Sequence, residues 1–300
     1  RTTNKEKMRK AFASGNAPSP FSKGAKIVKD ALSIAYNISG DIIIKPSISS
    51  GSRGVTHLPF NMKKDEDVIS SFYRAIENSF DNSVVIEEYL DGPEFSVEIV
   101  IWNNNPIVIA VTDKLTTGSP FFVELGHSQP SQFSMEVLNG IKEAAILGCK
   151  SLKLNCCSAH VEIKLQNNKP YIIEIGARLG GDFISTNLVY LSTGIDMVAA
   201  VINISLGFEP DLIPKHSPQG AAIRYFTPKS GKIKKLIVGK KVKVESNIIQ
   251  FEIYKKVGEL VSNIKSSLDR SGHVITIGRN AEEAILNAEK VLNSIKYEIE

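Results

Sequence analysis

The sequence predicts an α+β protein that ends in a domain rich in antiparallel β-structure. Apolar residues recur at helical spacing in several segments, among them residues 4–13, 23–37, 66–78, 135–147 and 280–295. Runs that alternate polar and apolar residues lie between them, as in EFSVEIVI at residues 94–101. After residue 208 strand patterns dominate, with AAIRYF, KIKKLIV, KVKV, IIQFEIY and SGHVITIG in succession.

Composition places the chain among globular proteins and excludes several classes of function. Its 300 residues are 42% hydrophobic and 23% charged, and no apolar run reaches the roughly 20 residues that cross a membrane. The first residues lack the apolar core of a secretory signal, so we expect a cytoplasmic protein. Lysines cluster at residues 229–243 without interleaved aromatic residues, which indicates a solvated strand face and no nucleic-acid partner. Cys149, Cys156 and Cys157 lack metal-site spacing and are expected to be buried free thiols.

Two lysines near the start of the chain are candidate phosphate ligands. Lys5 lies in the first turn of the first predicted helix, where it is either a surface residue or a phosphate ligand. Lys45 ends the apolar strand DIIIK and precedes SISSGSRGV, a loop whose backbone N–H groups can surround phosphate oxygens. The lysine of a Walker A loop follows its glycines, so this is a different motif. Most Ser/Gly-rich loops are simple turns.

A strand-turn-strand unit at residues 83–101 offers a candidate nucleotide edge. SVVIEEYL ends at Leu90, and the turn DGP then leads into EFSVEIVI. Such units are common in proteins of many functions. This one would form a nucleotide site if the backbone of residues 87–90 met an adenine ring and Glu94 accepted hydrogen bonds from a ribose.

A predicted β-hairpin at residues 161–176 carries the strongest chemical signal. Its strands, Val161–Leu165 and Tyr171–Gly176, flank a five-residue break that contains Asn-Asn and Pro. With that loop Leu165 faces Tyr171, Ile163 faces Ile173, and Glu162 faces Glu174. Opposed carboxylates with Cβ atoms about 5 Å apart are destabilising unless a cation lies between them. A divalent metal is the obvious candidate, although both glutamates could instead be solvated on an exposed sheet face.

Other polar residues surround this glutamate pair. His160 lies two positions before Glu162 and therefore on the same face of the strand. Arg178 follows the hairpin and adds a fixed cation, and the turn Gly180-Gly181-Asp182 permits close backbone approach. Glu124 and His127 precede a proline turn, where a lone histidine is more often structural.

The order and spacing of these motifs resemble the ATP-grasp superfamily, in which two α+β subdomains grip ATP. ELGHSQPS, AHVEIK, EIGARLGGD and the tail from AAIRYF to HVITIGRNAEEA are similar to its L-amino-acid ligases, which join a carboxylate to an amine. Biotin carboxylase and phosphoribosylglycinamide synthetase-like proteins are also similar. The resemblance implies four segments: a linker helix at 1–13 from a missing N-terminal domain, a lid subdomain at 14–86, a central subdomain with a metal site at 87–208, and a C-terminal α+β domain at 209–300.

The resemblance also implies roles for individual residues. It makes Glu162 and Glu174 ligands of Mg²⁺ or Mn²⁺ and Arg178 the residue that stabilises an acyl-phosphate. The implied ligands of ATP are Lys5, Lys45, Ser50, Gly51, Ser52, Glu87, Glu88, Tyr89, Leu90 and Glu94. The implied substrate pocket consists of Glu124, His127, His160, Gly180, Gly181 and Asp182. The family usually has Asn where this chain has Gly176, so water, Asp182 or Asn187 would have to supply the missing metal ligand.

The function implied by the resemblance is an ATP-dependent ligase. It would activate a small carboxylate, such as an amino acid, as an acyl-phosphate for attack by an amine, giving ADP and phosphate. Two alternatives stay open: a bicarbonate-using carboxylase or carbamoyl-phosphate-type enzyme, and an ATP-binding module without turnover. The expected partners are the small acid and amine, a second copy of the chain in a homodimer, and an N-terminal domain in cis or in trans.

Overall fold

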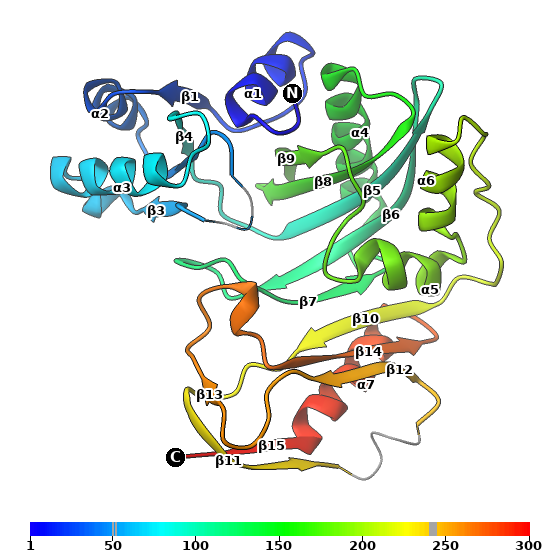
Figure 1. Cartoon of the computed structure of the whole chain (residues 1–300). Helices are drawn as coiled ribbons and strands as arrows, with labels where there is room; N and C mark the ends of the chain where they lie inside the picture. Colours follow the sequence, from blue (N-terminus) through cyan, green and yellow to red (C-terminus); the bar gives the residue numbers. More distant parts are fainter. Residues whose placement is uncertain (50, 52, 240–244) are drawn as a thin grey trace.

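An eight-stranded antiparallel sheet forms the centre of the computed structural model, which describes residues 1–49, 51, 53–239 and 245–300 (Figure 1). Its strand order is β12-β14-β10-β7-β6-β5-β8-β9. The strands are β5 (Glu94–Trp102), β6 (Asn105–Thr116), β7 (Glu124–Gln129), β8 (Cys157–Gln166), β9 (Lys169–Gly176), β10 (Gly220–Tyr225), β12 (Ile248–Ile253) and β14 (Gly272–Gly278). Because β7 pairs with β10, the sheet runs without a break from the central segment into the C-terminal one.

A four-stranded sheet with two helices forms a separate lobe above the large sheet (Figure 1). Its strands, in the order β1-β4-β2-β3, are Ser22–Ala25, Val84–Glu88, Ile42–Pro46 and Thr56–Leu58. Helices α2 (Val28–Asn37) and α3 (Asp65–Glu77) pack their apolar faces on it. The helix predicted at residues 23–37 is therefore wrong in its first turn, because residues 22–25 pair with β4 and bury Ala25.

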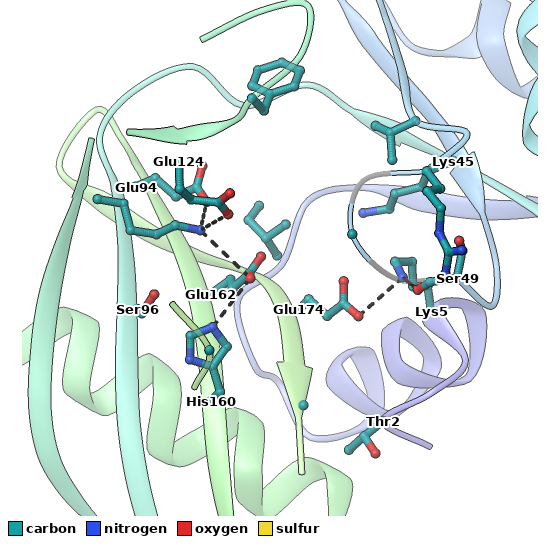
Figure 2. A pocket seen from close by; sticks show the side chains of 18 of the residues that line it. Thr2, Lys5, Lys45, Ser49, Glu94, Ser96, Glu124, His160, Glu162 and Glu174 are labelled. Atoms are coloured by element: carbon teal, nitrogen blue, oxygen red, sulfur yellow. Dashed lines mark hydrogen bonds and ion pairs between the residues drawn. The ribbon is translucent and has the colours of Figure 1, made fainter. Parts of the chain in front are cut away.

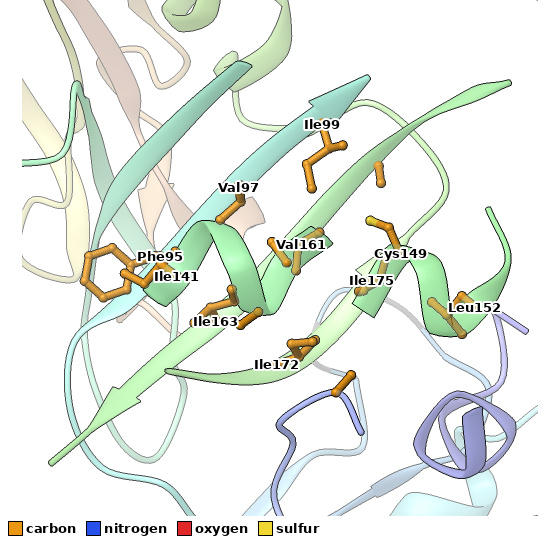
Figure 3. Packing of buried hydrophobic residues seen from close by; sticks show 14 of the residues in the cluster. Phe95, Val97, Ile99, Ile141, Cys149, Leu152, Val161, Ile163, Ile172 and Ile175 are labelled. Carbon is orange, nitrogen blue, oxygen red and sulfur yellow. The ribbon is translucent and has the colours of Figure 1, made fainter. Parts of the chain in front are cut away.

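Helix α1 (Lys5–Ser14) joins this lobe to the large sheet. Asn4 caps it, because its side chain accepts a hydrogen bond from the Lys7 N–H, and Met8 and Phe12 are fully buried. They belong to the same core cluster as residues of the hairpin β8–β9 and of helix α4 (Met135–Leu152), part of which Figure 3 shows. Of the three thiols expected to be buried, Cys149 is buried and Cys157 half-buried, but Cys156 is exposed because it lies in the turn before β8.

The hairpin β8–β9 differs from the predicted one in its turn and register. Its loop is only the pair Asn167-Asn168, with φ of 51° and 59°, as expected for a type I′ turn. Ile163 consequently pairs with Ile172, and the predicted pairs Ile163–Ile173 and Leu165–Tyr171 are wrong. A β-bulge at Ile173 then shifts the register by one residue. The predicted pair Glu162–Glu174 is confirmed because of this bulge.

The remaining elements complete the C-terminal part of the chain and cover the face of the large sheet opposite helix α4. Helix α7 (Ala281–Ser294) begins at the predicted cap Asn280, and a small sheet has the order β13-β11-β15, with strands Leu260–Val261, Gly231–Val238 and Ile295–Ile299. β15 was not predicted, and the predicted strand KVKV, residues 241–244, lies outside the described ranges. Three short helical segments cover the face of the large sheet opposite helix α4: η2 (Ile184–Leu188), α5 (Val189–Thr193) and α6 (Met197–Ser205). Within the described ranges no single helix is long and apolar enough to cross a membrane. The segments η2–α5 and α6 reach that length and apolar composition only when taken together, and the chain bends by 117° between them.

Candidate active site

A cavity of about 710 Å³ lies between the lobe and the large sheet. Most of the predicted site residues line it: Lys5, Lys45, Gly51, Glu87, Tyr89, Leu90, Glu94, Glu124, His127, His160, Glu162, Glu174, Arg178, Gly181 and Asp182. Glu88 is exposed outside the cavity, and Gly180 is buried behind it. Ser50 and Ser52 lie outside the described residues. The cavity thus brings together residues of helix α1, of the lobe and of the large sheet (Figure 2).

A row of charged residues crosses the large sheet beneath the cavity. Lys164, Glu94, Lys114 and His127 are successive partners on β8, β5, β6 and β7. The ammonium group of Lys114 lies 2.5 Å from Glu94, 3.6 Å from Glu124 and 3.9 Å from Glu162. Burial would lower the pKa of Lys114, but these three carboxylates raise it well above its usual range. Lys114 is therefore a cation shared by three predicted site residues.

The sequence predicts an apolar strand at residues 107–112, so Lys114 lies beyond its predicted end and was missed. The strand β6 runs to Thr116, and position 114 continues the two-residue alternation of Ala110 and Thr112. That alternation is the sequence signal that could have extended the predicted strand to Lys114.

The glutamates Glu162 and Glu174 lie opposite each other on β8 and β9 and face the cavity. Glu174 forms an ion pair with Lys5 at 3.3 Å, and Glu162 lies 3.5 Å from the His160 Nε2 (Figure 2). Lys114 in particular lowers the pKa of Glu162, so this carboxylate is ionised at neutral pH. Within the described ranges no three His, Cys, Asp or Glu side chains form a ready-made metal cage. Two carboxylates that face each other beside an open cavity nevertheless fit Mg²⁺, which binds one or two carboxylates together with phosphate oxygens and water.

A buried hydrogen-bond network holds His160 from behind. Its Nδ1 lies 2.5 Å from Glu98, which is fully buried and also accepts hydrogen bonds from Ser185 (2.9 Å) and the Gly180 N–H (3.2 Å). Burial disfavours the imidazolium, but Glu98 and Glu162 together raise the pKa of His160 to about 9. His160 is therefore a cation at neutral pH that links Glu98 to Glu162. Glu98 was missed, since its role depends on a partner on another strand.

The opposite wall of the cavity carries a second group of buried charges. Glu87 forms ion pairs with Lys45 and, at 2.7 Å, with the Nε of Arg9. Burial alone would raise the pKa of Glu87, but the two cations lower it to about 2. The Lys5 ammonium, 3.3 Å from Glu174, also donates to the Ser49 carbonyl at 3.2 Å and so bridges the two walls (Figure 2). The side chain of Glu87 is thus a counter-ion to Lys45, an arrangement that the sequence did not reveal.

Aromatic rings line one end of the cavity. His57 stacks on Tyr89 with ring centroids 4.0 Å apart, and Phe122 lies 6.2 Å from both rings. Lys164 places its ammonium 5.1 Å from the centre of the Tyr89 ring and donates to the Leu90 carbonyl at 3.2 Å. A flat heteroaromatic ring would find π-faces and a hydrogen-bonding cation there.

Asp182 lies at another end of the cavity, held by the C-terminal part of the chain. Both of its oxygens accept from the guanidinium of Arg270 at 2.9 Å, and His127 Nε2 lies 3.4 Å away. Burial lowers the pKa of His127, so its imidazole is neutral at pH 7. Arg270 also lies 3.8 Å above the centre of the Tyr225 ring. Asp182 is therefore already paired, and Arg270 is a further residue that sequence reasoning missed.

Gly176, the last residue of β9, lies beside Arg178. A Cβ atom at Gly176 would come within 3.2 Å of the Arg178 side chain, so the glycine gives this arginine room. Arg178 is exposed and donates to the Leu179 carbonyl at 2.8 Å. Asn187 lies outside the cavity and donates to Gln250 at 3.4 Å.

Comparison with known proteins agrees with this architecture. Residues 38–187 match the family described as ATP-grasp domain, and residues 224–300 match the L-amino acid ligase C-terminal domain 2. The chain belongs to the ATP-grasp family. The predicted ATP-grasp fold and the resemblance to L-amino-acid ligases are therefore confirmed.

Individual ATP-grasp proteins are similar over much of the chain. Alanine–anticapsin ligase of Bacillus subtilis is 27% identical over 228 residues, which cover 69% of this chain and 48% of that ligase. The crystal structure of an L-amino acid ligase from Bacillus licheniformis has a TM-score of 0.81 at 22% identity, covering 100% of this chain and 72% of that one. The biotin carboxylase domain of a Hydrogenobacter thermophilus 2-oxoglutarate carboxylase, in complex with MgADP, ADP and bicarbonate, has a TM-score of 0.73 at 17% identity and covers 100% and 66%. This ATP-grasp chain thus spans about half the length of the curated ligase.

Proposed function

We propose that the protein is an ATP-dependent ligase that joins a small carboxylate, most simply an amino acid, to an amine. The observation that carries this proposal is the opposed pair Glu162 and Glu174, surrounded by cations from both walls of one cavity. Phosphoryl transfer needs mostly positioning and charge neutralisation, and this is the chemistry that such a cavity supplies.

The reaction divides into two steps. A carboxylate is a poor acylating agent, so its oxygen first attacks the γ-phosphorus of ATP, and the bond from that phosphorus to ADP breaks. The amine nitrogen then attacks the acyl carbon, phosphate leaves, and the nitrogen loses a proton. Both steps build negative charge on oxygens that the lysines and arginine of the cavity can neutralise.

The residues of the chain have distinct roles in this scheme. Lys5 and Lys45 bind phosphate oxygens, and the aromatic end around Tyr89 receives the adenine. Arg178 stabilises the acyl-phosphate oxygens, since it is the exposed guanidinium beside the glutamate pair. Glu162 and Glu174 would hold Mg²⁺, which would neutralise negative charge on phosphate oxygens.

The end of the cavity around Asp182 suits the acid and the amine. His127 lines this end and is neutral at pH 7, so it is able to accept the proton that the amine loses. Glu124, 30% exposed, is a further carboxylate there that can bind an ammonium group. Asp182 shapes the pocket through its pairing with Arg270 rather than as a free charge.

One experiment tests the proposal against its alternatives. The protein is incubated with ATP and Mg²⁺ and with single amino acids, pairs of amino acids, or bicarbonate, and ADP, phosphate and amide products are measured. We expect ADP and phosphate release that requires amino acids and yields an amide. Release that requires bicarbonate alone would favour a carboxylase, and nucleotide binding without turnover in every arm would favour an ATP-binding module.

A further inference from the structure

The guanidinium group of Arg9, on α1, contacts two elements that are distant in the sequence, β4 and β9. It is 7% exposed, and its Nε lies 2.7 Å from a carboxylate oxygen of Glu87 on β4. Its Nη1 and Nη2 donate to the carbonyls of Ile172 and Ile173 on β9, each at 2.9 Å. Arg9 thus links α1, the lobe and the strand that carries Glu174.

The two carbonyls belong to consecutive residues, which indicates that Arg9 binds the bulge of β9. In a regular strand successive carbonyls point to opposite sides, one toward each neighbouring strand. The carbonyls of Ile172 and Ile173 both point to the outer edge of β9, because the bulge at Ile173 interrupts the regular alternation. Among the strands of the described residues β9 is the last in this sheet, so none of them pairs with these carbonyls. The two terminal nitrogens of Arg9 satisfy both.

The bulge decides which side of the sheet Glu174 occupies. The two-residue turn alone would place Ile173 opposite Glu162 and Glu174 opposite Val161, on the core side, because a shift of one residue reverses the face of every following side chain. In the structure Ile172 and Ile175 are fully buried in the core, whereas Ile173 and Glu174 line the cavity. Two successive residues on one side are the signature of the bulge.

Lys5 supports the same arrangement from the same helix. It lies four residues before Arg9, one turn away on the same face of α1, and forms an ion pair with Glu174. Helix α1 therefore binds the bulge with one cation and the carboxylate beyond it with another.

We propose that Arg9 is a positioning residue that holds the β9 bulge and so keeps Glu174 opposite Glu162. This inference rests on the proposed function, in which these two glutamates bind Mg²⁺ with ATP. An arginine is required because its planar group donates to two carbonyls and a carboxylate at once, whereas a lysine presents one compact ammonium. The proposal is thus distinct from a role as counter-ion to Glu87, which a lysine retains.

The test compares Arg9→Lys with Arg74→Lys, the same change at an exposed position of α3. Binding of a non-hydrolysable ATP analogue is measured by calorimetry with and without Mg²⁺, together with thermal unfolding. We expect Arg9→Lys to weaken Mg²⁺-dependent binding at least 10-fold and metal-free binding less than 3-fold, with no change in Arg74→Lys. Mg²⁺-dependent binding within 2-fold of the unmodified protein would overturn the proposal, even if the variant melted at a lower temperature. If the unmodified protein shows no Mg²⁺-dependent binding, the proposed function itself fails.

Deletion of Ile173 gives a second, independent test. Without this residue the register set by the turn brings Glu174 opposite Glu162 with no bulge. In that background Arg9→Lys should change Mg²⁺-dependent binding less than 3-fold, and a loss as large as in the parent chain would contradict the proposal. If Arg9→Lys does not fold in the parent chain, we expect the same variant to fold once Ile173 is deleted. A double variant that also fails to fold would contradict the proposal.

Discussion

The two walls of the cavity neutralise their charges in different ways. On the sheet wall, Lys164, Glu94 and Lys114 alternate in sign along one row of cross-strand partners. On the lobe wall, Glu87 is paired with Lys45 on the neighbouring strand and with Arg9 on a helix 78 residues away in the sequence. Strand register therefore organises one wall and tertiary contacts organise the other. A local change in one strand can disturb the sheet wall. The charges of the lobe wall are paired only when β4, β2 and α1 come together.

The largest effect is expected at the centre of the sheet wall. Lys114→Met removes the cation shared by Glu94, Glu124 and Glu162 and leaves, among the described residues, only the His160 imidazolium, beside Glu162, as an ion-pair partner of these partly buried carboxylates. We expect the free energy of unfolding to fall by about 3–5 kcal/mol, measured by chemical denaturation. Lys150→Met, at an exposed position of α4, should change it by less than about 0.5 kcal/mol. A similar small change in Lys114→Met would show that the alternating row is not what stabilises this wall.

The next effect concerns Glu174, the residue where the two walls meet. Glu174→Gln keeps its size but removes the charge that we assign to Mg²⁺ binding. We expect the rate of ADP release to fall by about 100- to 1000-fold. The circular dichroism spectrum should not change, because the ion pair with Lys5 is only partly buried. Full Mg²⁺-dependent activity in this variant would show that the metal is bound elsewhere.

Acid should affect the lobe wall through Glu87. Its pKa is lowered from 4.5 to about 2, so its contribution to stability is complete above pH 4.5 and is lost as the pH falls toward 2. The shift corresponds to at most about 3 kcal/mol. Unfolding measured between pH 5 and pH 2.5 should show this loss in the unmodified protein and in Glu88→Gln, the exposed neighbour, but not in Glu87→Gln. Equal acid sensitivity of the two variants would contradict the assignment.

The smallest effect is expected at the hairpin turn, which begins the register of β8 and β9. Asn168 has a φ of 59°, and a β-branched side chain is unfavourable in this left-handed region. Asn168→Val should lower the free energy of unfolding by about 1–2 kcal/mol, whereas Asn168→Gly should leave it within about 0.5 kcal/mol. If both variants behave alike in chemical denaturation, the turn does not limit the stability of the hairpin.

How well the sequence predicted the molecule depended on the range of the interaction. The alternation of polar and apolar residues placed His160, Glu162 and Glu174 on one face, since that pattern is local. The pairing of Glu162 with Glu174 was correct through two errors that cancel, a loop predicted too long and a bulge not foreseen. A bulge depends on what binds its exposed carbonyls, and in this chain that is Arg9, 163 residues away from Ile172.

The residues missed by sequence reasoning have partners that are distant in the chain. Arg270 binds Asp182 across 88 residues, and Glu98 binds His160 across 62. No spacing rule connects such pairs, because their proximity follows from the order of the strands. Lys114 was missed for a simpler reason, the uncertain end of a strand, which is the least reliable part of any pattern of alternation.

The pairing of β7 with β10 has a consequence for how this protein can be divided. A chain ended at residue 208 would lack β10 and leave β7 as an open edge, and the backbone groups of β7 that point toward β10 would be unpaired. It would also lack Arg270, so Asp182 would face the cavity as an uncompensated charge. The C-terminal segment is consequently not a detachable module. Exchanging it between relatives would transplant part of the pocket wall together with three of the eight strands of the large sheet, β10, β12 and β14.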